Sequence, residues 1–178
     1  PYIVRPLNVP SAWPGRDYAV HQSAAGTVIV INLLGRVFMD PVNDPFGPTI
    51  QFLAELQERY QTRLTVVDFH AEATAEKIAF STFMDGRCTL VAGTHTHVQT
   101  ADERIMQEGT AAITDVGMTG PSEGVIGMDR QSSLRRFVDH LPAPYEVAAG
   151  PMQLNAVFVE ADPVSGRATH IERIQINE

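Results

Sequence analysis

Three short apolar runs, separated by segments with helical patterns, constrain the fold of this chain most strongly. The runs cover residues 27–34, 64–70 and 88–93, and the first is rich in β-branched and aliphatic residues, as in a strand buried on both faces. One helical pattern begins at Pro48, and the other starts at Thr74, which can cap it. This order predicts an α/β layered protein, in which functional sites lie beyond the carboxyl ends of the strands.

The second half of the chain is expected to extend the sheet and then to add a hairpin. Residues 111–114 form another short apolar run before a glycine-rich loop, and a short helix is expected around 132–141. Residues 153–160 and 167–176 have strand-like patterns, and the turn-prone segment 162–166 joins them. These features predict a closing antiparallel hairpin.

The composition is typical of one globular domain comprising residues 1–178, with 44% hydrophobic and 19% charged residues. A formal net charge of -8 disfavours stable binding to long nucleic acids or to an anionic membrane. No segment has the length and apolarity of a membrane span or a signal peptide. Because Cys88 is the only cysteine, no intrachain disulfide can form, and a cytoplasmic location is expected.

His70, His95 and His97 are the strongest candidates for a functional site. His70 ends the second apolar run, and the other two form a His-x-His pair just after the third run. Because the carboxyl ends of parallel strands meet at one edge of a sheet, the three imidazoles are expected to converge on a metal. Gly93, beside the pair, is expected to let the backbone approach the metal closely. The pattern indicates a metal-dependent hydrolase site.

Four further residues, Asp68, Glu72, Thr96 and Asp115, are candidates for contacts with a metal-binding imidazole or with the substrate. Asp68 shares a strand face with His70 and can orient an imidazole, and Glu72 can do the same. Both carboxylates equally fit a solvated or helix-capping role. Asp115 ends another strand, where it can contact the substrate or a metal-bound water; the alternative is an Asx turn that enters the glycine-rich loop.

Six strings of the sequence together resemble one protein family. They comprise residues 5–8, 35–40, 68–74, 85–87, 93–102 and 114–120. The strings closely resemble those of the bacterial YmdB-like metallophosphoesterases, a 2′,3′-cyclic-nucleotide 2′-phosphodiesterase family of the calcineurin-like superfamily. The resemblance implies an α/β/β/α four-layer sandwich, N-terminally incomplete in this chain. It also implies two metal ions, usually iron or manganese with zinc also suited to the ligands, and hydrolysis of phosphodiesters such as 2′,3′-cyclic nucleotides.

Carried over residue by residue, the resemblance implies that His70 and His95 bind one metal and that His97 binds the other. The implied mechanism is attack on phosphorus by a hydroxide held between the two metals. The family's metal-binding Asp, its Glu-Asn pair and its Gly-Asn-His motif, which supplies the acid histidine, have no counterpart in these residues. The chain is therefore expected to be the C-terminal portion of a longer domain, to require the N-terminal segment as a partner, and to be inactive alone.

Two alternatives stay open at this point. Three histidines and one water make a complete catalytic zinc set, so a mononuclear zinc hydrolase or hydratase would need no further residue. A noncatalytic, metal-stabilised regulatory module is the second alternative. The sequence does not choose the metal, the nucleotide or the oligomeric state, and it leaves a homo-oligomer open.

Overall fold

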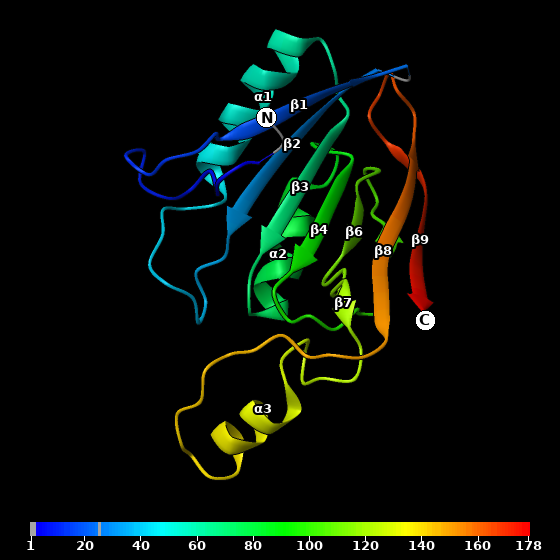
Figure 1. The fold of residues 1–178 in the computed structure, drawn as a ribbon. Helices are drawn as coiled ribbons and strands as arrows, with labels where there is room; N and C mark the ends of the chain where they lie inside the picture. Colours follow the sequence, from blue (N-terminus) through cyan, green and yellow to red (C-terminus); the bar gives the residue numbers. More distant parts are fainter. Residues whose placement is uncertain (1–2, 25) are drawn as a thin grey trace.

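A six-stranded mixed sheet forms the centre of the protein in this computed structural model, which describes residues 3–24 and 26–178 (Figure 1). The strand order is β1-β2-β3-β4-β6-β5. Strands β2, β3, β4 and β6 are parallel, and β1 and β5 run antiparallel at the two edges. The bounds are β1 (Tyr18–Ser23), β2 (Gly26–Leu34), β3 (Thr65–His70), β4 (Leu90–Thr94), β5 (Arg104–Ile105) and β6 (Ala111–Ile113).

Helices α1 (Gly47–Tyr60) and α2 (Thr74–Met84) cover one face of this sheet and form the main core with it. Alternate residues of β2 point toward the helices, as the two-residue period of a strand requires. The rings of Phe69 on β3 and Phe80 on α2 stack with centroids 4.1 Å apart. The core members from these elements are Ile29, Ile31, Leu33, Leu53, Leu56, Val67, Phe69, Phe80 and Met84.

A three-stranded antiparallel sheet packs against the other face at the β4–β6 side (Figure 1). Its strands are β7 (Gly120–Pro121), β8 (Met152–Ala161) and β9 (Ala168–Asn177), and β8 and β9 form the predicted hairpin. The described residues thus supply three layers of the expected α/β/β/α sandwich. Helix α3 (Arg130–Phe137) lies apart from both sheets, in the excursion between β7 and β8. None of the described helices is both long and apolar enough to cross a membrane.

The structure differs from the sequence prediction at several elements, of which two helices and one strand are the clearest. Helix α2 begins at Thr74 as expected, but its N-cap residue is Ala73 and no side chain caps it, so the capping role predicted for Thr74 is wrong. Helix α3 ends at Phe137 rather than at 141, and its cap is the Asp129 carboxylate. Strand β1 was not predicted. Its last three residues are exposed and polar, and its pairing depends on the backbone of β2.

Candidate metal centre

His70 and His95 meet at the carboxyl ends of two adjacent parallel strands. His70 ends β3, where it is in register with Thr94, the last residue of β4, and His95 follows directly. The Nε2 atom of His70 lies 3.0 Å from the Nδ1 atom of His95, and the two rings are nearly perpendicular. Neutral imidazole is a common metal ligand. Two ring nitrogens this close together could both bind one metal ion.

A chain of hydrogen bonds fixes the His70 ring. The Asn32 amide and the Thr94 hydroxyl each donate to the Asp68 carboxylate over 2.7 Å. Because the Thr94 hydrogen is used in this way, its Oγ1 accepts from the Nδ1–H of His70 over 3.0 Å. The Nε2 lone pair of His70 consequently faces His95. Burial, followed by the nearby His95, lowers the pKa of His70, which favours the neutral ring that a metal requires.

Glu72 fixes the His95 ring from the other side. Its Oε2 atom lies 2.9 Å from the Nε2 atom of His95, so this carboxylate accepts the Nε2–H. The His95 lone pair is then on Nδ1, directly opposite the lone pair of His70. Two ring nitrogens with lone pairs 3.0 Å apart repel one another, and a cation that both of them bind removes this repulsion. The two ring nitrogens thus fit a metal ion. Without a metal, a proton shared between them would take its place.

His97 lies apart from this pair, although it belongs to the same loop. Its Nδ1–H donates to the carbonyl oxygen of Ile126 over 3.0 Å, which leaves Nε2 as the free ligand atom. Among the described residues, no group of three His, Cys, Asp or Glu side chains is placed to hold one ion. The expectation that all three histidines converge on one point is therefore not met. The assignment of His97 to a second metal stays a prediction.

The loop that carries His95 and His97 has an unusual backbone, with φ angles of 120° and 66° at these two residues. The Asp115 carboxylate supports it by accepting the backbone N–H of Thr96 over 2.9 Å. Its other oxygen accepts the N–H of Gly117 over 2.9 Å, which closes the Asx turn weighed in the sequence analysis. Thr96 thus contributes its backbone to this support.

Asp115 is 1% exposed, and its suggested contact with a substrate or a metal-bound water stays a prediction. Its Oδ2 atom forms an ion pair with Lys77 of α2 over 2.9 Å. Burial alone would raise the pKa of Asp115, but Lys77 and the two backbone N–H groups outweigh it, and the net pKa is lowered. The carboxylate stays charged and keeps the loop attached to α2.

Sequence reasoning missed Thr94, Asn32 and Lys77. Lys77 carried a signal, because it is the chain's only lysine and lies on the same face of α2 as Phe80 and Met84. A charged residue within an apolar helical stripe indicates a buried partner. Thr94 and Asn32 carried no comparable signal, since their role depends on the register of β2, β3 and β4.

The layered fold is that of the calcineurin-like α/β type, to which a phosphatase of known structure also belongs. The chain belongs to the YmdB-like protein family, which it matches over residues 1–174. It is 47% identical, over its whole length and 67% of the relative, to a Bacillus subtilis (strain 168) protein named 2′,3′-cyclic-nucleotide 2′-phosphodiesterase.

Two further similarities involve Mycoplasma pneumoniae. A putative phosphatase/phosphodiesterase of this organism is 40% identical, over 99% of the chain and 64% of the relative. The crystal structure of a novel phosphatase from Mycoplasma pneumoniae superposes with a TM-score of 0.84 at 38% identity, covering 98% of this chain and 63% of that one. The chain thus spans about two thirds of the length of the proteins it matches.

Proposed function

We propose that the complete polypeptide is a two-metal phosphodiesterase that acts on 2′,3′-cyclic nucleotides. The observation that carries this proposal is the close approach of His70 Nε2 and His95 Nδ1, which lie 3.0 Å apart. The family and the name of the Bacillus subtilis relative support the substrate class. Because the chain spans about two thirds of its relatives, the activity is assigned to the complete polypeptide.

His70 and His95 would hold one metal and His97 would contribute to a second. Imidazole ligands suit iron, manganese and zinc, with iron or manganese preferred on the family resemblance. Two bound metals would supply an activated water and neutralise the charge that develops on the phosphate. The hydrogen-bond partners of the two imidazoles would determine which ring nitrogen carries the proton. They are Thr94, which itself donates to Asp68, for His70, and Glu72 for His95.

The two alternatives differ in what they require of the histidines. A mononuclear zinc enzyme needs three ligands around one ion, whereas the described residues bring only His70 and His95 within contact. A noncatalytic regulatory module needs the metal but no turnover. The geometry therefore disfavours the single-zinc enzyme, and turnover is the property that separates the two-metal enzyme from the regulatory module.

The test is hydrolysis of 2′,3′-cyclic AMP with manganese or iron, by the complete polypeptide and by the 178 residues alone. We expect turnover only from the complete polypeptide, because one imidazole would hold the second metal weakly in the shorter chain. His97→Ala should abolish turnover, while His140→Ala, at an exposed residue beyond α3, should not. Robust metal-dependent turnover by the 178 residues would support the single-zinc enzyme instead. Metal binding without turnover of any phosphodiester would support the regulatory module.

A further inference from the structure

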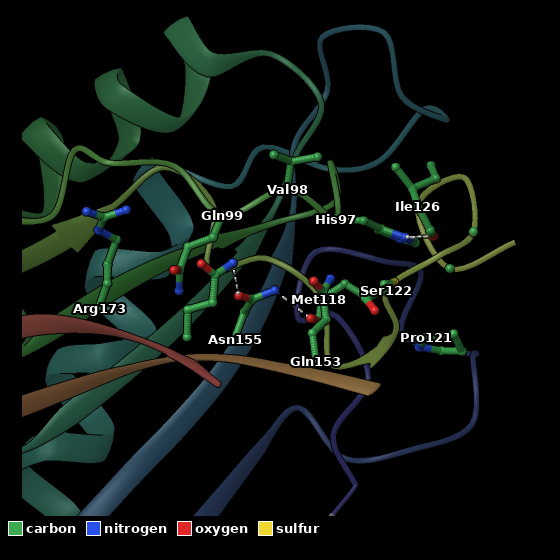
Figure 2. A pocket seen from close by; sticks show the side chains of 13 residues that line it. His97, Val98, Gln99, Met118, Pro121, Ser122, Ile126, Gln153, Asn155 and Arg173 are labelled. Atoms are coloured by element: carbon green, nitrogen blue, oxygen red, sulfur yellow. Dashed lines mark hydrogen bonds between the residues drawn. The ribbon is translucent and has the colours of Figure 1, made fainter. Parts of the chain in front are cut away.

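A polar pocket of about 290 Å³ opens beside His97 (Figure 2). Its walls come from the loop after β4, from the 118–127 segment, and from the face of β8 and β9 that is turned toward the larger sheet. In the view of Figure 2, Arg173 lies at one end of the pocket, and His97 lies toward the other end, beside Ile126. His97, one of the proposed metal ligands, is part of the lining of this pocket.

Side-chain amides dominate the polar lining of the pocket. Asn155 is fully engaged, because its Nδ2 donates to the Met118 carbonyl over 2.7 Å and its Oδ1 accepts from Gln175 over 3.2 Å. Gln99 is held by donation to the Ala156 carbonyl over 3.0 Å. These bonds fix the framework of the pocket wall. They use the amide nitrogens of Gln99 and Gln175 and leave the side-chain oxygens of both residues without a hydrogen bond to any described residue.

Gln153 is the most available of these amides. It is half-buried in the pocket wall, and its side chain makes no hydrogen bond to any residue in the described ranges. Its amide therefore offers one donor group and one acceptor side by side. Adjacent donors and acceptors of this kind match the edges of nucleobases, as asparagine and glutamine do when they bind adenine.

The charge of the pocket favours a neutral ligand. Arg173 and His97 are the ionisable residues of its described lining. The Arg173 guanidinium is already paired with Glu103, with Nε and Oε2 2.8 Å apart, so the wall offers no uncompensated cation for a second phosphate. Val98 and Ile126 add exposed apolar surface, 60% and 48% exposed, against which a planar ring can lie.

We propose that this pocket binds the base of the nucleotide whose phosphodiester lies at the metal centre. This inference rests on the proposed function. It assigns to the pocket the discrimination of one nucleotide from another. The volume lies just below the range for small-molecule sites, about 300–1,000 Å³, which fits a single base rather than an oligonucleotide. Gln153 and Gln175 would hydrogen-bond the base, and Asn155 would position Gln175.

The experiment compares the complete metal-loaded polypeptide with its Gln153→Leu and Gln175→Leu variants. The substrates are the four 2′,3′-cyclic nucleotides and 1-O-methylribose 2,3-cyclic phosphate, which keeps the phosphodiester and the sugar but lacks a base. We expect the wild type to have a kcat/KM at least tenfold higher for its preferred nucleotide than for the base-free compound. In each Leu variant this ratio of kcat/KM values, the gap, should be about tenfold smaller, since a hydrogen bond to the base is lost.

A matched control is Gln51→Leu, an exposed glutamine of α1 on the opposite face of the sheet, which should keep the gap of the wild type. Thermal melts establish that each variant is folded, and Gln153→Leu breaks no bond within the protein. A wild type that turns over all five substrates equally, or a gap that survives in both variants, would overturn the base pocket while leaving the phosphodiesterase intact. Absence of turnover of every substrate would overturn the proposed function itself.

Discussion

Lys77 and Asp115 form a buried ion pair, with Nζ and Oδ2 2.9 Å apart and side chains 3% and 1% exposed. The same Oδ2 atom accepts the backbone N–H of Thr96, which lies between His95 and His97. This ion pair thus links α2 to the loop that carries two of the three candidate ligands. The fold and the metal centre are coupled through this single carboxylate.

Replacing Lys77 by Met should destabilise the protein by about 3–5 kcal/mol, because a buried carboxylate is left without its counter-charge. Urea unfolding followed by circular dichroism measures the change. Arg135→Met, which removes a cation from an exposed position of α3, is the matched control and should change stability by less than about 0.5 kcal/mol. A Lys77→Met protein as stable as this control would contradict the role assigned to the pair.

The same carboxylate predicts a pH dependence of stability. The folded-state pKa of Asp115 lies below its unfolded value of about 3.9, so its contribution is present above that pH and is lost as the pH falls through the lowered pKa. Asp115→Asn should therefore show a shallower fall in stability under acidic conditions than the wild type. If the free energy of unfolding falls equally steeply in the two proteins below about pH 4, Asp115 does not make this contribution.

Thr94→Val should weaken metal binding about 10–100-fold, because the hydroxyl that links Asp68 to His70 is removed while the shape is kept. Competition with a chelator measures the affinity in the complete polypeptide. Thr94→Ser restores the hydroxyl and is expected to recover most of the affinity. If the Ser and Val variants bind metal equally well, the hydrogen-bond chain is not what orients His70.

Gly93 is required by the backbone of the next strand. A Cβ added there would lie 1.9 Å from the Thr114 carbonyl oxygen, so the close approach foreseen from the sequence is to protein rather than to an ion. Gly93→Ala should lower the free energy of unfolding by about 1–3 kcal/mol. Gly120→Ala, whose added Cβ would have its nearest neighbour at 3.8 Å, is the control and should be nearly neutral. Equal stabilities would contradict this packing.

Cys88 should be unreactive in the folded protein. Complete burial raises the pKa of its thiol to about 12, so almost no thiolate exists at pH 8. A chromogenic disulfide reagent is expected to label it only after denaturation in urea. Labelling of the native protein at the rate of a free thiol would show that the interior around Cys88 opens readily.

The elements that sequence predicts well are those defined by burial. Residues 27–34 and 64–70 appear as β2 and β3 within one residue of the predicted bounds, because a strand buried in a parallel sheet needs continuous apolar residues. The helix from Pro48 begins one residue earlier, at Gly47. Strand β1 depends on hydrogen bonds to β2 that no apolar pattern records, which is why it was missed.

The site was predictable to the extent that topology determines it. The carboxyl ends of β3 and β4 must lie side by side, and this places His70 beside His95. The direction of His97 depends instead on the carbonyl of Ile126, 29 residues further along the chain, in a loop whose conformation the sequence does not reveal. The hydroxyl relay through Thr94 likewise depends on side-chain rotamers.

Metal content tests the central claim most directly. The complete polypeptide and its His97→Ala variant are loaded with manganese, separated from free metal, and analysed by mass spectrometry of the bound metal. The two-metal account predicts about two ions per wild-type chain and about one per His97→Ala chain, because His70 and His95 still hold theirs. One ion per wild-type chain, lost completely in His97→Ala, would contradict the account and indicate a single metal shared by all three histidines.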